Sequence, residues 1–344
     1  MKLTLLFISL VTIAGSCSKS KSPSNNNLSP TNLTVTAVIS NDSSGKVSFT
    51  AAATNAVSYV YDYGDGESQT VASGIMTYKY PSSGSYTVNV TAKSAGGQTL
   101  SKSILVTVTV ILSLKWSDEF DTPGSPDVTR WGYEIGDGCP NVCGWGNNEL
   151  EWYTNRPENV IVQGGVLKIT AVKESFNGKP YTSARLISKD KYSFKYGKIE
   201  VKAKLPAGGG TWPAIWMLGN NINTVGWPAG GEIDIMEHRG NYLNTISGAL
   251  HHPGHSGGNA DARTVNIPNV STEFHRYAVE WTPLSIKFLV DDSPFFTFVN
   301  TRTLPFNQNF FIILNVAMGG NFGGPVDPAF TSAAMEIDYV RVYQ

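Results

Sequence analysis

Short segments in which apolar and polar residues alternate follow one another along most of the chain, with glycine, proline, asparagine and serine between them. Alternation with a period of two is the pattern of a β-strand that has one face in a core. Four such segments in the first third of the chain predict a small β-sandwich over residues 31–110. The same pattern continues over residues 113–344 and predicts a second, larger all-β domain. The four segments are residues 35–39, 46–51, 86–92 and 100–107.

Tyrosines alternate in the first domain at Tyr59, Tyr61 and Tyr63, directly before a tight turn predicted at Gly-Asp-Gly. Their spacing favours packing in a sandwich core, and an exposed platform that stacks on sugars is the alternative. Residues 60–66 and 78–88 resemble the signatures of the polycystic-kidney-disease (PKD) repeat, an Ig-like β-sandwich. The resemblance implies a spacer domain, with carbohydrate or protein binding as a further role.

The N-terminus has the pattern of an export signal. Residues 1–16 hold a lysine, an apolar run too short to span a bilayer as a mature helix, and the small pair Gly15-Ser16. A small pair before Cys17 resembles a bacterial lipobox, which implies lipidation of Cys17 and attachment to a bacterial membrane or cell surface. Plain secretion is the alternative. The polar residues 17–30 predict a flexible tether.

A cluster of carboxylates lies in the second domain, where residues 231–239 read Gly-Glu-Ile-Asp-Ile-Met-Glu-His-Arg. In a regular strand Glu232 and Asp234 share one face, and Glu237 lies on the other. We predict a one-residue β-bulge near Met236 that returns Glu237 to the acidic face. Two carboxyl groups about 5–5.5 Å apart are what retaining glycosidases use. A solvated acidic strand and a calcium site are the alternatives for this segment alone.

The preceding apolar segment carries Trp212 and Trp216 at equal parity, and flat aromatic rings stack on sugars. Together with the carboxylate cluster, these residues give the second domain a resemblance to the family 16 glycoside hydrolases, and within them to the laminarinase-like endo-β-1,3-glucanases. The segments that carry the resemblance are residues 114–120, 145–154, 181–186, 196–206, 210–219, 231–239, 314–320 and 335–343.

The resemblance implies a β-jelly-roll sandwich that hydrolyses internal bonds of a β-1,3-glucan. Carried over position by position, it makes Glu232 the nucleophile, Glu237 the acid/base and Asp234 the residue that orients and tunes both. A charge on Glu232 disfavours a second one nearby, so we expect the pKa of Glu237 to rise. The positions implied for substrate binding are Asn147, Arg185, Trp212, Trp216, Trp227 and His251.

Related family members cut mixed-linkage glucan or marine galactans, and these substrates are the nearest alternatives. A non-catalytic, glycan-binding surface lipoprotein is the alternative from another class. The net charge of −1 argues against nucleic-acid binding, which needs a basic surface. We expect a monomer whose partner is a β-glucan polysaccharide and whose membrane contact is limited to the lipid anchor.

Acid/base hydrolysis of glycosides needs no cofactor. The family resemblance implies a structural Ca²⁺ held by the Asp338 carboxylate, with carbonyl donors from Gly165 and Glu119. An Asp338 side chain that merely faces solvent is the alternative. The histidines at positions 251, 252 and 255 also allow a metal site, which we consider the weaker interpretation.

Two cysteines, Cys139 and Cys143, are separated by three intervening residues in a glycine-bounded segment. An exported protein occupies compartments in which disulfides persist, so we predict a disulfide that pins this loop. Zinc is the competing interpretation, but two thiolates without a nearby histidine pair make an incomplete ligand set.

Overall fold

The computed structural model describes residues 28–344, so the predicted export signal, Cys17 and most of the tether lie outside the described residues. Nearly all regular structure in the described part is β-strand, and no helix there is long and apolar enough to cross a membrane. The helical segments are short: η1 (Cys143–Gly146), α1 (Ile222–Val225), η2 (Gly257–Asn259) and α2 (Gly320–Gly323).

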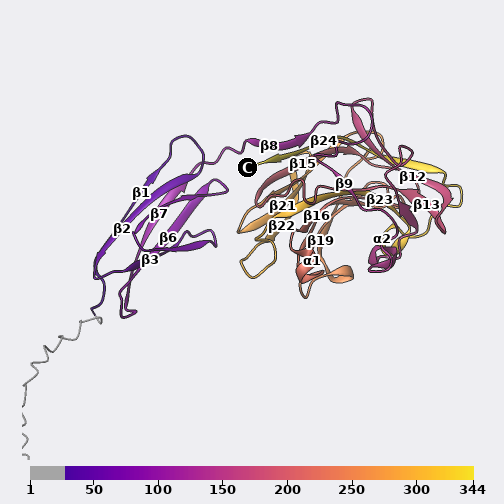
Figure 1. Ribbon diagram of the computed structural model, residues 1–344. Helices are drawn as coiled ribbons and strands as arrows, with labels where there is room; N and C mark the ends of the chain where they lie inside the picture. Colours follow the sequence, from indigo (N-terminus) through magenta and orange to yellow (C-terminus); the bar gives the residue numbers. More distant parts are fainter. Residues whose placement is uncertain (1–27) are drawn as a thin grey trace, which may run out of the picture.

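The first strands form two antiparallel sheets around a core of their own (Figure 1). Tyr59, Tyr61 and Tyr63 are at most 6% exposed, which confirms the prediction that they pack in a core. A sugar-stacking platform at these positions is therefore excluded. One sheet has the order β1 (Thr31–Ile39), β2 (Lys46–Thr54), β5 (Ile75–Lys79), and the other β4 (Ser68–Val71), β3 (Ser58–Asp62), β6 (Gly84–Lys93), β7 (Thr99–Val108).

The remaining strands form two larger sheets, of which the outer one contains ten strands. Its order is β10 (Glu151–Tyr153), β13 (Lys179–Ser183), β12 (Val166–Phe176), β24 (Ser332–Tyr343), β15 (Gly197–Lys204), β20 (His275–Trp281), β21 (Ser285–Val290), β22 (Ser293–Val299), with β11 (Val160–Gln163) beside β12 and β8 (Leu114–Asp118) beside β24.

The inner sheet contains seven strands and curves beneath the outer sheet (Figure 1). Alternate side chains of the two sheets meet in one hydrophobic core, as expected for a sandwich. The short helices α1 and α2 lie below the inner sheet, on opposite sides of its curved face. The strand order is β19 (Asp261–Asn266), β18 (Thr245–His251), β17 (Glu232–His238), β16 (Thr211–Gly219), β23 (Phe310–Met318), β14 (Arg185–Ile187), β9 (Gly132–Tyr133).

Strand β23 shows why this sheet is stable at its centre. All nine of its residues are buried, and eight of them are apolar. Because β23 pairs with β16 along their whole length, it also fixes the strand that carries the two tryptophans. Asn315 is the polar residue of β23, and its side chain faces away from the core toward β16 and β10.

Candidate active site

Strand β17 contains the predicted β-bulge. Its residues Glu232, Asp234 and Glu237 pair with residues of equal parity on β16, so all three project from one face of the sheet. The register shifts between Asp234 and Glu237 against β18 as well. Ile235 and Met236, the two residues between them, both lie in the hydrophobic core. The bulge therefore lets one strand place two consecutive apolar residues inward and three carboxylates outward.

Each of the two outer carboxylates accepts a hydrogen bond from a tryptophan. Trp227 Nε1 donates to Glu232 Oε2 over 2.8 Å, and Trp212 Nε1 donates to Glu237 Oε1 over 2.9 Å. Neither tryptophan belongs to the core, and Trp227 is 51% exposed. Both indoles are thus held at the carboxylates while their rings stay available at the surface of the inner sheet.

His251 lies beside the central carboxylate, because it pairs with Glu232 between β17 and β18. Its Nε2 is 3.0 Å from Asp234 Oδ2 and 3.8 Å from Glu232 Oε1. Asp234 Oδ2 has no hydrogen-bond partner of good geometry, so the nearer contact is electrostatic rather than a directed bond. On the other side of the ring, the backbone N–H of Gly257 donates to His251 Nδ1 over 3.1 Å. Because Nδ1 accepts this hydrogen bond, a neutral His251 ring carries its proton on Nε2. Nε2 is the ring nitrogen next to Asp234.

Burial raises the pKa of all three carboxyl groups. Burial and the charge of Asp234 raise the pKa of Glu232 to about 8. Burial raises the pKa of Glu237 to about 7, with the hydrogen bond from Trp212 acting against it and the charge of Glu232 adding to it. Burial and the charge of Glu237 hold the pKa of Asp234 well above its usual range. At neutral pH the three carboxyl groups together therefore retain at least one proton that can be transferred.

The raised pKa of Glu237 agrees with the expectation from the sequence. The raised pKa of Glu232 is not expected from the sequence. Sequence reasoning treats Glu232 as an ordinary ionised carboxylate. The structure largely buries Glu232 beside Asp234, where burial and the Asp234 charge both disfavour its ionised form. The three carboxyl groups therefore titrate as one set.

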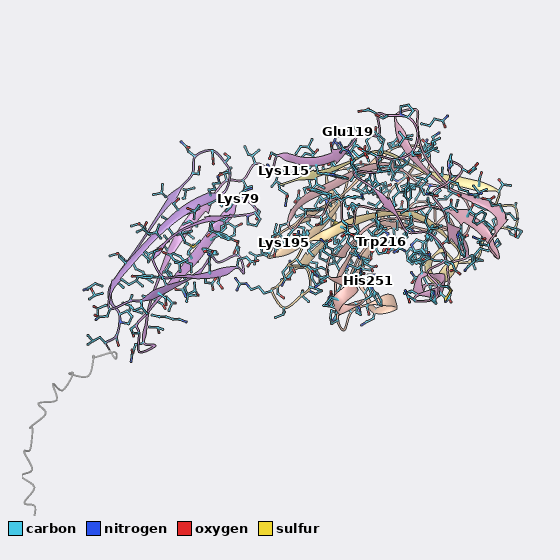
Figure 2. The ribbon with its side chains drawn as sticks, in the orientation of Figure 1. Lys79, Lys115, Glu119, Lys195, Trp216 and His251 are labelled. Atoms are coloured by element: carbon cyan, nitrogen blue, oxygen red, sulfur yellow. A yellow bond between two sulfur atoms is a disulfide. The ribbon has the colours of Figure 1, made fainter. Side chains whose placement is uncertain are left out.

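Arg185 and Trp216 form a stack beside the carboxylates. The Arg185 guanidinium lies 4.7 Å from the ring centre of Trp216 and 4.3 Å from that of Trp145. Its Nε is 2.6 Å from Glu134 Oε2, and the residue is buried. The charge of Arg185 is thereby already paired, so its main effect is to hold the Trp216 ring from behind. Figure 2 shows Trp216 and His251 on the side of the inner sheet away from Glu119.

A chain of hydrogen bonds continues from Trp216 into the interior. Trp216 Nε1 donates to Asn315 Oδ1 over 2.7 Å, and Asn315 Nδ2 donates to the Tyr153 hydroxyl over 3.0 Å. Tyr153 in turn donates to Glu149 Oε2 over 3.0 Å, and Asn147 Nδ2 donates to Glu149 Oε1 over 3.2 Å. The predicted residue Asn147 is therefore joined to Trp216 through this chain.

Sequence reasoning missed five residues of these networks: Glu134, Trp145, Glu149, Tyr153 and Asn315. Asn315 carried a signal, because it is the polar residue in the otherwise apolar segment Phe310–Met318. Trp145 and Tyr153 lie in a segment that supports the family resemblance, but their spacing does not reveal a partner 30 or more residues away. Glu134 has no local signal.

The residues predicted to hold calcium lie on the outer sheet, distant from the carboxylates of β17. Register brings the three together, because Asp118 pairs with Val340 and Leu167 pairs with Ile337. The Asp338 carboxylate, however, forms an ion pair with Lys202, at 2.7 Å between Nζ and Oδ2. The Glu119 side chain binds Arg341 through both carboxylate oxygens. The Lys202 ammonium group thus lies where the Asp338 carboxylate would bind a calcium ion.

The loop before β10 carries a disulfide between Cys139 and Cys143, as predicted. Within that loop Val142 N–H donates to the Gly138 carbonyl, and η1 follows directly. The loop leads into Trp145 and Asn147, so the disulfide restrains the segment that supplies one side of the Arg185 stack.

Two family models match this chain. A family model described as Glycosyl hydrolases family 16 matches residues 146–341. A second model, described as Beta-glucan synthesis-associated protein SKN1/KRE6/Sbg1, matches residues 56–234 and overlaps the first over residues 146–234. The first match contains the whole of strands β16, β17 and β18, which carry Trp212, Trp216, the three carboxylates and His251.

Individual relatives match about two thirds of the chain. A beta-glucanase of Rhodothermus marinus is 46% identical over 247 residues, which are 67% of this chain and 85% of that protein. The glucan endo-1,3-beta-glucosidase A1 of Niallia circulans is 38% identical over 68% of this chain and 38% of its own length. The X-ray structure of the laminarinase from Rhodothermus marinus superimposes with a TM-score of 0.64 at 45% identity, over 68% of this chain and 98% of that chain.

Proposed function

Since this chain belongs to the glycosyl hydrolases of family 16, we propose that it cleaves internal β-1,3 bonds of a β-glucan such as laminarin, with Glu232 as nucleophile and Glu237 as acid/base. The observation that carries the assignment is the bulge of β17, which puts both glutamates on one face with Asp234 between them. The names of the relatives, a beta-glucanase, an endo-1,3-beta-glucosidase and a laminarinase, support the substrate.

In the first step, Glu237 gives its proton to the glycosidic oxygen while the Glu232 carboxylate attacks the anomeric carbon. The bond to the leaving sugar breaks, and an ester between Glu232 and the remaining sugar forms. In the second step, Glu237, now ionised, takes a proton from water, and the water oxygen displaces Glu232 from the sugar. Two displacements at one carbon retain its configuration. Trp227 and His251 favour the ionised form of Glu232, because both lower its pKa.

Asp234 and His251 are proposed to adjust this pair. Burial keeps the pKa of Asp234 high, so the residue resists adding a further negative charge between the two glutamates. The Nε2 proton of His251 faces Asp234 and lies near Glu232. When Glu232 is esterified and loses its charge, the cost of ionising Glu237 falls, and the same glutamate can then act as a base.

The charges around the site favour a neutral polysaccharide over a sulfated one. The guanidinium of Arg185 is paired with Glu134 and enclosed by two indoles, so it is not free to bind a sulfate group. Purified protein incubated with laminarin, mixed-linkage glucan, agarose and carrageenan tests the proposal by release of reducing ends. We expect turnover of laminarin to a ladder of oligosaccharides. Turnover of a galactan alone, or binding of laminarin with no release, would assign a different substrate or a non-catalytic function.

We also propose that the first unit, residues 31–110, is a PKD-type spacer that separates the enzyme from a lipid-anchored N-terminus. Its aromatic side chains are used in its own core, which suits a spacer better than a sugar-binding module. Residues 1–16 and Cys17, the export signal and lipidation site of this proposal, lie outside the described residues. Replacing Cys17 with Ala should move the protein from the membrane fraction to the soluble fraction. Unchanged partitioning would contradict lipidation.

A structural Ca²⁺ at Asp338, Gly165 and Glu119 is a further proposal. The donors, one carboxylate and two carbonyls, are of the oxygen type that calcium prefers. Bound calcium would replace the Lys202 ammonium as partner of the Asp338 carboxylate. A melting temperature that falls on treatment with a chelator and recovers with Ca²⁺ would support the site, and an unchanged one would exclude it.

A further inference from the structure

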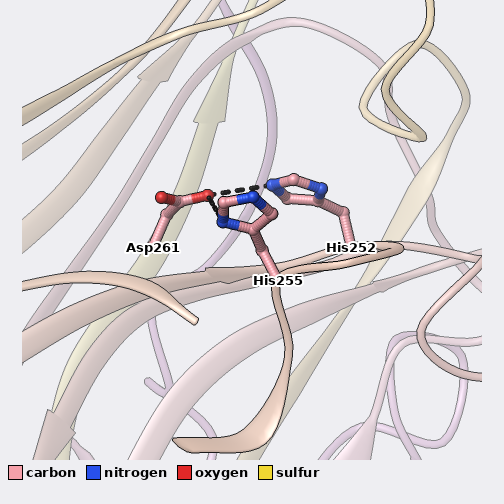
Figure 3. Close-up of side chains that lie close together, drawn as sticks. All are labelled: His252, His255 and Asp261. Carbon is pink, nitrogen blue, oxygen red and sulfur yellow. Dashed lines mark hydrogen bonds and ion pairs between the residues drawn. The ribbon is translucent and has the colours of Figure 1, made fainter. Parts of the chain in front are cut away.

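Three side chains that the proposed reaction does not use converge where β18 leads into β19. His252 Nε2 lies 2.9 Å from Asp261 Oδ2, and His255 Nδ1 lies 3.0 Å from the same oxygen. The two imidazole rings are stacked, with their centres 4.8 Å apart (Figure 3). The potential ligand atoms of the three residues all lie within 4.8 Å of one another. Two imidazole nitrogens and one carboxylate oxygen at this spacing form a possible metal-binding set.

The backbone holds the two histidines in this arrangement. Residues 252–255 read His-Pro-Gly-His, and Gly254 has a φ of +86°, which suits the third position of a turn with proline before it. The N–H of each histidine donates to the carbonyl of the other, over 2.8 and 2.9 Å. Residues paired in this way place their side chains on the same side of the ribbon. Asp261 is fixed independently by its pairing with Leu250 on β18.

The second ring nitrogen of His252 has a partner of the kind that metal-binding histidines use. Nδ1 lies 3.3 Å from the carbonyl oxygen of Pro253, and the ring packs near Phe298 and Phe306. His252 is 5% exposed. A neutral imidazole donates from one nitrogen, so if Nδ1 donates to the carbonyl, Nε2 directs a lone pair at the Asp261 carboxylate. A cation between the two acceptors would turn that repulsion into attraction.

We propose that His252, His255 and Asp261 bind a divalent transition-metal ion of the zinc type. Two imidazoles with one carboxylate suit Zn²⁺ and its neighbours, whereas calcium and magnesium prefer oxygen ligands throughout. Buried His252 and half-exposed His255 and Asp261 leave one side open, so water would complete a four-coordinate site. Among the salt bridges of residues 28–344, Asp261 pairs with these histidines and with no lysine or arginine.

The position of the site gives the ion a second effect, which rests on the proposed function. Metal binding joins both ends of the segment 252–261, and that segment includes Gly257. The Gly257 N–H is the group that holds His251 Nδ1, and His251 Nε2 faces Asp234. An ion at the His252 site therefore stabilises the loop that orients His251, without contacting the carboxylates of β17.

Zinc titration of the untagged full-length chain, stripped with a chelator, tests the metal site by calorimetry and by equilibrium dialysis. We expect one strongly bound Zn²⁺ per chain and a melting temperature that rises with Zn²⁺. Cobalt in place of zinc should give the visible absorption of a four-coordinate Co²⁺ site. The variants His255→Ala and Asp261→Asn should each weaken binding by more than about 10-fold, because losing a ligand costs more than losing an outer-shell partner.

A matched control separates this site from the carboxylates of β17. Glu232, Asp234 and His251 also lie close enough to hold a metal ion, so zinc bound there would be lost in a His251→Ala variant and kept in His255→Ala. The proposal requires the opposite result. His255 is half-exposed, so its replacement should leave the fold intact, which circular dichroism checks. A wild-type chain that binds no zinc, or a His255→Ala variant that binds zinc as the wild type does, would overturn the proposal, whatever the enzyme hydrolyses.

Discussion

Among single residues, Glu232 and Glu237 differ in how far the need for each depends on the leaving group. Glu232→Gln should reduce turnover of laminarin by several orders of magnitude, because no ester can form. Glu237→Gln should do the same on laminarin but retain the first step on a substrate with an activated aryl leaving group, which needs little protonation. Turnover of laminarin and the burst of aryl release before steady state, which reports the first step alone, check this difference in both variants. A Glu237→Gln variant that loses the aryl burst as fully as it loses laminarin turnover would contradict its role as the acid.

Burial of Glu232 also predicts a pH-dependent effect on stability. Its pKa is about 8 in the folded chain and has a reference value of 4.5, so the folded state resists an ionisation that the unfolded chain permits. The resulting stability is fully present below about pH 4.5 and is lost as the pH rises toward 8. Glutamine does not titrate. Glu232→Gln should therefore gain on the order of 2–4 kcal/mol relative to the wild type between pH 4.5 and pH 8.

Chemical unfolding of the wild type and of Glu232→Gln at both pH values measures this gain. If the difference between the two proteins stays constant from pH 4.5 to pH 8, the raised pKa of Glu232 is wrong. Glu273→Gln, a change at an exposed glutamate, is the matched control.

Trp227 combines an exposed ring with a hydrogen bond to Glu232, and two substitutions separate these properties. Trp227→Ala should raise KM for long glucan chains by about 3–10-fold through loss of the ring, on the order of 1 kcal/mol. Trp227→Phe should keep most of that binding and lower kcat, because Glu232 loses a donor. Because Trp227 lies outside the core, the melting temperature should change little in either variant. A lowered melting temperature with unchanged KM would remove Trp227 from the site.

At the scale of elements, the sequence predicts strand β17 well. Three acids at positions 232, 234 and 237 do not fit one face of a regular strand, and that mismatch alone predicts the bulge that the structure contains. The stack of Trp145, Arg185 and Trp216 is different, because its members come from a loop and two strands that meet through the sheet order β16-β23-β14. Long-range pairing of this kind leaves no periodic signal in one sequence.

The histidine motif at the end of β18 shows the same limit. His251 and His252 are adjacent, so their side chains point to opposite faces of the sheet. His251 faces the carboxylates of β17, and His252 faces Asp261. From the sequence, His251, His252 and His255 together are one candidate metal site. In the structure His251 joins Glu232 and Asp234, while the other two histidines join Asp261, because a strand turns adjacent side chains to opposite faces.

Across the whole molecule, three polar interactions of Glu67 and Ser68 join the first unit to the larger sandwich within residues 28–344. Glu67 lies near Lys195 and Tyr196, and Ser68 accepts a hydrogen bond from Arg302. Exposed pairs of this type contribute little to stability, about 0–1 kcal/mol each. Each unit also has its own core. Residues 113–344 alone should therefore hydrolyse soluble laminarin at close to the rate of the longer chain.

Steady-state kinetics of the two chains check this expectation, with circular dichroism to establish that the shorter chain is folded. A folded chain of residues 113–344 with much lower kcat/KM on soluble laminarin would assign the first unit a part in catalysis. An equal rate on soluble laminarin, with a loss on insoluble glucan, would assign it a part in reaching the substrate.

The most direct test of the central claim, a retaining pair formed by Glu232 and Glu237 across the bulge of β17, is the configuration of the first-formed product. Proton NMR of a laminarin digest follows the anomeric signals before mutarotation mixes them. We expect the new reducing end to appear first as the β-anomer, because a glycosyl ester on Glu232 forms and is then displaced. An α-anomer as the first product would mean that water attacks the sugar directly, and would contradict the assignment of Glu232 as the nucleophile.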